Sequence, residues 1–278
     1  MSLTYIRHGE RPTFTKDFDE ISAWNTSARL KENKFDEPLT KKGRIESYFT
    51  GVKLCGILNF DNIDYIYTSP MTRCIDTSIA IITSVERITG KRLKLRIEYA
   101  LCERKSLFSL SCITFDGDNI INNNQNEHDP YVMTDNNNVI DERLMFKNLK
   151  KKYSKYIDYN YCSLVSDSDI NVERPIVALI DFVSTIKKIT TENINSIIVC
   201  HNANPFLYTY YYLTQEELNV SKLLKLYKKL DGAKSLNFVS IFNKYEQLPP
   251  QHAPLGFISA SNNSPNVWDV VLQPTRII

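Results

Sequence analysis

Near its start, the chain places a histidine between two arginines, directly after a run of residues typical of a β-strand. The segment is LTYIRHGERP, residues 3–12, and the three side chains are Arg7, His8 and Arg11. Arginine forks match the geometry of phosphate oxygens and stay charged at any working pH. A histidine among such cations is held neutral and keeps a lone pair for attack. We therefore expect Arg7 and Arg11 to bind a phosphate group and His8 to act as a nucleophile toward phosphorus.

Three further reactive side chains follow later predicted strands. Arg73 comes shortly after DYIYTS, Glu103 after KLRIEYALC and His201 after SIIVC. Ligands of open parallel sheets bind at the carboxyl ends of the strands, so these side chains should meet His8 at one edge. Taken singly, each has an ordinary structural explanation, as a surface cation, a capping carboxylate or a packing histidine. Their coincidence favours a site in which Arg73 binds phosphate, Glu103 protonates the leaving oxygen and His201 donates to the phosphoryl oxygens.

The bulk composition narrows the classes of partner. With 34 basic and 32 acidic residues the net charge is +2, so we expect neither nucleic acid nor a membrane surface as a partner. The expected partner is a phosphorylated small molecule or a phosphoprotein substrate, and a homodimer is left open. No carboxylate cluster suited to a metal is evident, so we expect no metal and no cofactor. The six cysteines form no C-x-x-C pair, which predicts free thiols and a cytoplasmic location.

Strand-like and helix-like runs alternate as in a parallel sheet covered by helices. The predicted strands lie at 3–7, 64–69, 94–100, 196–201 and 234–245, and the predicted helices at 42–58, 71–89, from 175 and from 205. We expect helix 42–58 to bury an apolar face made of Ile45, Phe49, Val52, Cys55 and Leu58. We expect the helix from 175 to bury Val172, Ile176, Leu179, Val183 and Ile186. The predicted fold class is α/β, as a three-layer α/β/α arrangement with a mostly parallel central sheet.

One stretch interrupts the alternation between the third and fourth predicted sheet strands. Residues 105–172 hold an Asn-rich tract and a basic, aromatic stretch, and asparagine favours turns. We therefore expect one domain over residues 1–278, with 105–172 as an inserted cap containing an Asn-rich loop. Four tyrosines of this region are candidates for lining a cleft, although packing is the expected role of most: Tyr131, Tyr153, Tyr156 and Tyr161.

Five segments carry a resemblance to a known family. They are RHG at 7–9, DEPLTKKG at 36–43, YTSPMTRCIDT at 67–77, EYALCER at 98–104 and IIVCH at 197–201. In this order they resemble the histidine phosphatase superfamily, which has the phosphoglycerate-mutase-like fold. More narrowly, RHGER and the C-terminal pattern LNFVSIFNKYEQLPPQHAPLGF…WDVVLQ resemble the phosphatase domain of the suppressor-of-T-cell-receptor-signalling proteins and ecdysteroid-phosphate phosphatase.

The resemblance assigns a role to each candidate residue. It implies a phosphohistidine intermediate on His8, with Glu103 as proton donor and His201 as the second histidine. It also implies three phosphate ligands, Arg7, Arg11 and Arg73. The fit is not complete, because HNANPF, which begins at the second histidine, lacks the aspartate of the acid-phosphatase branch. Asn202 cannot act as the acid, which leaves Glu103 in that role.

The predicted function is therefore a metal-independent phosphatase that hydrolyses phosphomonoesters. Protein phosphotyrosine and small aryl or steroid phosphates are candidate substrates, and sugar phosphates and nucleotides stay open because all of them present the same group. A phosphoglycerate mutase is one alternative, although mutases usually carry Ser and Asn after RHG where this chain has Arg11 and its neighbours. A protein that recognises phosphate with little catalysis is the other.

Overall fold

Strands from widely separated parts of the chain form one six-stranded sheet. The computed structural model describes residues 2–28, 30, 36–102, 113–116, 119–122, 153–165, 175–192, 195–201, 257–264 and 267–272. In sheet order, the strands are β3 (Lys94–Ile97), β2 (Tyr65–Thr68), β6 (Asn195–Cys200), β1 (Ser2–Arg7), β7 (Phe257–Ser264) and β8 (Val267–Leu272).

The first four strands of that order are parallel, and the last two run antiparallel to their neighbours. The late strand β6 lies between β2 and β1, and Arg7 of β1 is in register with Cys200 of β6. The residues that follow these two strands are therefore brought side by side. The predicted mostly parallel sheet is confirmed, whereas the antiparallel pair β7–β8 was not predicted from the sequence. The predicted helix from 205 and β segment at 234–245 lie outside the described residues.

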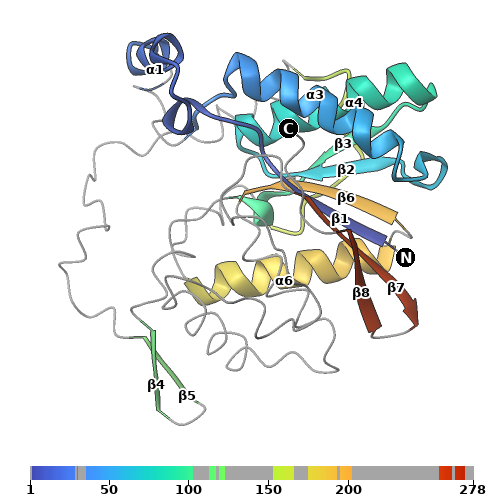
Figure 1. The fold of residues 1–278 in the computed structure, drawn as a ribbon. Helices are drawn as coiled ribbons and strands as arrows, with labels where there is room; N and C mark the ends of the chain where they lie inside the picture. Colours follow the sequence, from blue (N-terminus) through green and yellow to red (C-terminus); the bar gives the residue numbers. More distant parts are fainter. Residues whose placement is uncertain are drawn as a thin grey trace.

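Helices cover both faces of this sheet. Figure 1 shows α3 (Lys41–Cys55) and α4 (Thr72–Thr89) on one face and α6 (Pro175–Glu192) on the other. A further helix, α1 (Phe18–Asn25), and the 3₁₀ helices η1 (Pro12–Phe14), η2 (Phe60–Asn62) and η3 (Tyr99–Leu101) lie in the connections. The predicted three-layer α/β/α arrangement is confirmed.

Helix α3 begins and ends near its predicted limits but buries only part of the expected apolar face. Its first turn is capped by Thr40, whose Oγ1 accepts a hydrogen bond from the Gly43 N–H at 2.9 Å. The expected apolar face is confirmed only in part. Ile45 and Phe49 are 58% and 50% exposed, whereas Cys55 and Leu58 pack, partly buried, against the main core. The buried residues are mostly small: Gly43, Ser47, Thr50, Gly51 and Leu54. Small side chains let α3 lie directly against α4, as a larger apolar face would not.

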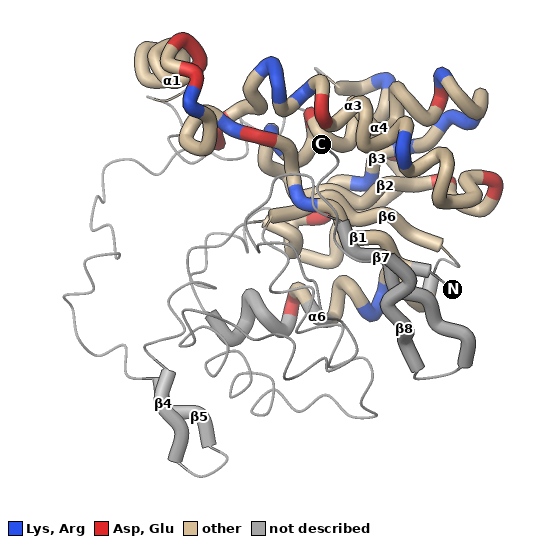
Figure 2. Tube along the Cα trace, viewed as in Figure 1, with Lys and Arg blue, Asp and Glu red and all other residues tan. Residues whose placement is uncertain are grey.

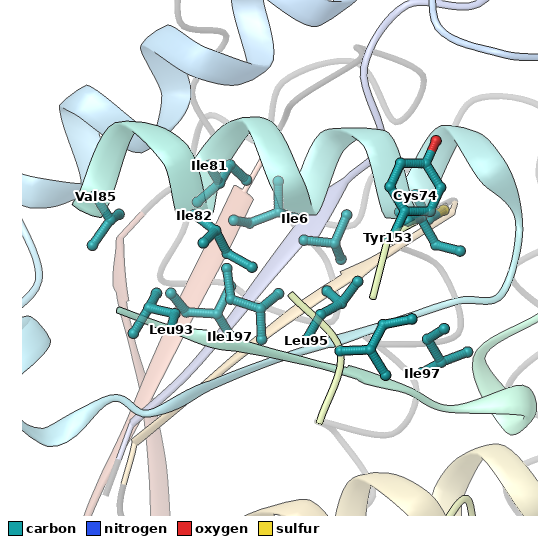
Figure 3. Packing of buried hydrophobic residues seen from close by; sticks show 14 of the residues in the cluster. Ile6, Cys74, Ile81, Ile82, Val85, Leu93, Leu95, Ile97, Tyr153 and Ile197 are labelled. Carbon is teal, nitrogen blue, oxygen red and sulfur yellow. The ribbon is translucent and has the colours of Figure 1, made fainter. Parts of the chain in front are cut away.

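The main core lies between the parallel strands and α4. Figure 3 shows Ile81, Ile82 and Val85 of α4 facing side chains of the sheet such as Leu95 and Ile197. The predicted helix at 71–89 is confirmed by α4, and it ends at Gly90, which has a φ of 75°. On the other face, α6 buries Phe182, Ile186 and Ile189. Of the face expected for α6, Ile186 is buried as predicted, Val172 lies outside the described residues, and nothing is described of the other three side chains.

The region 105–172 contributes two described pieces. One is the hairpin of β4 (Ile113–Asp116) and β5 (Asn119–Asn122), which pair with each other in a sheet of their own. The other, residues 153–165, continues the main sheet beyond β3, because Leu95 exchanges backbone hydrogen bonds with Tyr156 and Asp158 at 2.8 and 2.9 Å. The assignment of 105–172 as a cap stays a prediction.

The four tyrosines of this region have different surroundings. Tyr153 is buried in the main core and donates a hydrogen bond to Asp76 Oδ1. Tyr156 packs against the same core, and Tyr161 donates to Glu98 Oε2 at 2.5 Å. These three therefore have packing or bonding roles, and Tyr131 lies outside the described residues.

Charge is mixed along the described surface. Figure 2 shows Lys and Arg interspersed with Asp and Glu along α3 and α4 and along the segment that leads away from β1. Among the described helices, none combines the length and the apolar character needed to cross a bilayer.

Candidate active site

Two buried histidines lie at the carboxyl ends of the neighbouring strands β1 and β6. The backbone N–H of His8 donates to Cys200 O at 2.9 Å, which fixes the two strand ends to each other. The ring centroids of His8 and His201 are 5.5 Å apart, with the ring planes at 67°. The structure thus brings together two residues that are almost two hundred positions apart in the sequence.

The surroundings of His8 fix its tautomer. Its Nδ1 lies 2.8 Å from Gly9 O, and a carbonyl oxygen only accepts, so Nδ1 carries the proton. The lone pair is then on Nε2. Burial lowers the pKa of His8 well below its ordinary value of 6.5, and the charges of Arg73, His201 and Arg7 lower it further. His8 is therefore a neutral imidazole with Nε2 available as a nucleophile.

His201 has the opposite tautomer. Arg73 Nη2 lies 3.3 Å from its Nδ1, and because a guanidinium only donates, this Nδ1 accepts. The proton is on Nε2, which donates to Ser69 Oγ at 2.8 Å. Burial lowers the pKa of His201 well below 6.5, and Arg73, Arg11 and Arg7 add to the effect. His201 is thus neutral and has one N–H to offer to an acceptor.

Arg73 is held in the first turn of α4. The preceding residue, Thr72, donates through its backbone N–H to Asp36 Oδ1 at 2.7 Å and through its Oγ1 to Asp36 Oδ2 at 2.8 Å. The buried Asp36 carboxylate therefore caps the helix from a distant loop. Arg73 is itself fully buried, so its charge acts on the two histidines with little screening by water.

Arg7 and Arg11 approach the same aromatic ring. Their Cζ atoms lie 5.4 and 4.4 Å from the centroid of Phe14, the last residue of η1. Arg11 also forms an ion pair with Glu37, with Nη1 3.1 Å from Oε1. The charge of Arg7 lowers the pKa of both histidines, and the charge of Arg11 lowers the pKa of His201.

Gly9 lets helix α3 approach the backbone beside His8. A Cβ at Gly9 would lie 2.8 Å from Gly43 O and 2.8 Å from Ser47 Oγ, closer than real Cβ contacts. Its N–H donates to Thr77 Oγ1 at 3.0 Å, and the same Oγ1 donates to Arg73 O at 2.7 Å. A hydrogen-bonded chain thus connects the turn after His8 to the helix that carries Arg73.

The structure therefore assembles five of the six predicted site residues: Arg7, His8, Arg11, Arg73 and His201. Glu103 lies outside the described residues, and its role stays a prediction. Within the described part of the chain, no group of three His, Cys, Asp or Glu side chains is arranged to hold a metal ion.

Several residues of the site were not identified from the sequence. Asp36 and Glu37 lie in the quoted segment DEPLTKKG, but charged residues in a polar loop are usually solvated. The signal that could have found them is their position beside Leu39 and Thr40, just before the capped start of α3. Phe14 and Thr77 were also not identified. Thr77 meets Gly9 from a distant part of the sequence, and the contacts of Phe14 with Arg7 and Arg11 depend on the turn of the chain after β1.

Three solved structures are similar to this chain. The ecdysone phosphate phosphatase from Bombix mori, in complex with tungstate, has a TM-score of 0.54 at 14% identity, covering 98% of this chain and 92% of that chain. A phosphoserine phosphatase from Entamoeba histolytica, in complex with 3-phosphoglyceric acid, has a TM-score of 0.42 at 15% identity, covering 99% and 96%. A mycobacterial glucosyl-3-phosphoglycerate phosphatase has a TM-score of 0.44 at 11% identity, covering 98% of each chain.

No protein-family model matches the chain, and no curated protein sequence does. The similarity to the first of the three structures shows a shared fold, and it agrees with the architecture predicted from the sequence.

Proposed function

We propose that this chain, which has the fold of the histidine phosphatase superfamily, is a phosphatase that hydrolyses phosphomonoesters through a phosphohistidine on His8. The observation that carries the proposal is the pair of buried, neutral histidines at the ends of β1 and β6, with the Arg73 guanidinium on His201 Nδ1. A neutral imidazole beside fixed cations is suited to attack a phosphoryl group, which brings negative charge into the site.

In the first step, the lone pair of His8 Nε2 attacks phosphorus and the bond from phosphorus to the ester oxygen breaks. The proton for the leaving oxygen comes from Glu103, a role that rests on the family resemblance. Three guanidinium groups balance the charge of the phosphoryl oxygens, and His201 offers them the Nε2 proton that Ser69 accepts in the unliganded site.

In the second step, water attacks the phosphohistidine. Glu103 takes one proton from this water, the bond between phosphorus and Nε2 breaks, and phosphate leaves. His8 is returned as the neutral imidazole, so no net change remains in the protein. No step in this scheme assigns a task to a metal ion or a cofactor.

We propose an aryl or steroid phosphate, or a phosphotyrosine side chain, as the substrate. The half-exposed ring of Phe14 beside Arg7 and Arg11 supports an apolar group next to the phosphate. The name of the similar Bombix mori protein, an ecdysone phosphate phosphatase, points the same way. A panel of aryl, steroid, sugar and protein phosphates would rank these classes by kcat/KM.

The test is turnover of p-nitrophenyl phosphate in EDTA by the wild type and by His8→Ala. We expect the wild type to be active without added metal and the variant to lose activity by at least about 10³-fold, since it lacks the nucleophile. His128→Ala is the matched control, because the proposal gives His128 no role, and it should keep wild-type activity.

Full activity of His8→Ala would contradict the proposal. Activity that appears only with 2,3-bisphosphoglycerate would favour the mutase alternative. Saturable phosphopeptide binding without phosphate release from any substrate would favour the binding protein.

A further inference from the structure

Both carboxylate oxygens of Glu37 accept hydrogen bonds from the segment that follows His8. Its Oε1 accepts from Arg11 Nη1 at 3.1 Å and from Thr13 Oγ1 at 3.2 Å, and its Oε2 accepts from the Thr13 N–H at 3.0 Å. Glu37 is only 5% exposed, so these bonds are weakly screened. A single residue of the loop before α3 thus holds both the backbone at Thr13 and the guanidinium of Arg11.

Phe14 contacts the same guanidinium. The Arg11 Cζ lies 4.4 Å from the Phe14 centroid, within the range of a cation–π contact. Phe14 follows directly after Thr13, so the hydrogen bonds between Glu37 and Thr13 also fix the position of the backbone that carries the Phe14 ring. Arg11 is therefore restrained by an aromatic ring and by a buried carboxylate that belong to different parts of the chain.

Such restraint matters for a long side chain that binds phosphate. An arginine side chain has many rotamers, and ordering it when the ligand arrives would reduce affinity. Glu37 also has an opposing effect, since its negative charge repels a phosphate dianion. Removing the charge would therefore weaken phosphate binding if positioning dominates and strengthen it if repulsion dominates.

We propose that positioning dominates, and that Glu37 is a positioning residue which, together with Phe14, holds the Arg11 guanidinium ready for the substrate phosphate. The inference rests on the proposed function, because it takes Arg11 as a phosphate ligand. It adds to that function a carboxylate that never touches the substrate and acts only through Arg11.

The test is the variant Glu37→Gln, with p-nitrophenyl phosphate as substrate and inorganic phosphate as ligand. Glutamine keeps the shape, but its NH₂ group cannot accept from Thr13 or Arg11. We expect KM and the Kd of phosphate to rise about 10-fold with kcat within about 3-fold, since Arg11 binds the phosphate in the ground state and the transition state alike. If the role of Glu37 were purely structural, the variant would have a lower melting temperature but no rise in KM at nearly constant kcat.

A double-mutant cycle isolates the path through Arg11. Glu37→Gln in an Arg11→Ala background should leave the KM of Arg11→Ala unchanged, because the side chain to be positioned is gone. The matched control is Glu10→Gln, which alters another buried carboxylate, in the segment that follows His8. Glu10 accepts from Thr40 Oγ1 at 3.2 Å and lies 3.6 Å from Lys42 Nζ, so its change should leave KM at the wild-type value.

Several results would overturn the inference: an unchanged or lower KM in Glu37→Gln, or the same increase when Arg11 is already absent. Phosphate affinity, measured by calorimetry on all variants, separates a failure of this inference from a failure of the proposed function. If His8→Ala stays active while Glu37→Gln weakens phosphate binding, the mechanism fails and the inference stands. If the wild type does not bind phosphate, both are wrong.

Discussion

At the scale of single residues, burial beside guanidinium groups sets the chemistry of His8 and His201. Desolvation is the largest cause of their lowered pKa values, and the arginines act in the same direction. Both effects disfavour the imidazolium form, so a proton taken up by either histidine is costly in the folded protein. The same arrangement that keeps His8 and His201 neutral therefore makes folding sensitive to acid.

We expect the free energy of unfolding to fall as the pH drops below about 6.5. Below that value both histidines become protonated in the unfolded chain but stay neutral in the folded protein, so the unfolded state binds more protons. Each histidine contributes up to about 1.4 kcal/mol per pH unit in this window and nothing at higher pH. Urea unfolding between about pH 7.5 and 5 measures the slope.

The variant His201→Gln tests this assignment. It removes one of the two groups, so its stability should depend less steeply on pH than that of the wild type. If the free energy of unfolding depended equally on pH in both proteins, groups other than His201 would be responsible for the acid sensitivity.

Local sequence was informative for some of these residues and not for others. Arg7, His8 and Arg11 stand within one short motif at a strand end, so their chemistry can be read from adjacent positions. Glu37 looks like a loop carboxylate, and only its contacts with Arg11 and Thr13 show that it belongs to the site.

At the scale of elements, small residues let α3 lie close to two neighbours. Gly43 faces the backbone of Glu10, and Gly51 faces Ser84 and Ile81 of α4. Gly43, Ser47 and Gly51 recur every four residues and line the buried side of α3. Ser47 Oγ donates to Gly43 O at 2.6 Å, so this polar side chain is buried with its hydrogen bond made inside the helix. The apolar period in α3 therefore predicted its buried side only in part, because close approach of backbones selects for small volume.

We expect Gly51→Ala to destabilise the protein by about 2 kcal/mol. The added Cβ would lie 1.9 Å from Ser84 Oγ and 2.9 Å from the Cα and O of Ile81, and the helix backbone cannot move aside cheaply. Gly56→Ala is the control, since its Cβ would meet only Lys53 O at 3.5 Å, and it should change stability by less than about 0.5 kcal/mol. Equal effects of the two variants in urea unfolding would contradict this account.

At the scale of the whole molecule, one buried carboxylate joins the sheet to residues 153–165. Glu98, just after β3, accepts at Oε1 from Ala100 N at 3.0 Å and Ser163 Oγ at 2.5 Å. Its Oε2 accepts from Tyr161 OH at 2.5 Å and Leu164 N at 3.0 Å. Three of the four donors thus come from a segment more than sixty positions away, and Glu98 ties that segment to the strand end.

We expect Glu98→Ala to lower the free energy of unfolding by about 3 kcal/mol, because four hydrogen bonds to a buried carboxylate would be lost. Hydrogen exchange should speed up in residues 153–165 more than in the parallel strands. Glu86→Gln is the control, since it alters an ion pair with the exposed Arg92 and should cost less than about 0.5 kcal/mol. Unchanged exchange in 153–165 would show that Glu98 does not hold this segment.

The sequence by itself determined the alternation of strands and helices up to β3, and the residues that stand at the strand ends. Both follow from short-range patterns, since hydrophobic period and motif spacing are set by neighbouring positions. The sequence also predicted that His8 and His201 would meet, because parallel strands end at a common edge.

Tertiary structure decided what depends on distant partners. The insertion of β6 between β2 and β1 puts the two histidines side by side, and the antiparallel β7 and β8 complete the sheet beyond β1. The inward face of α3 is set by its distance from α4 and from the backbone at Glu10, and the surroundings of Glu37 are set by the position of Arg11. These features depend on which segments pack together, and a local pattern of residues does not contain that information.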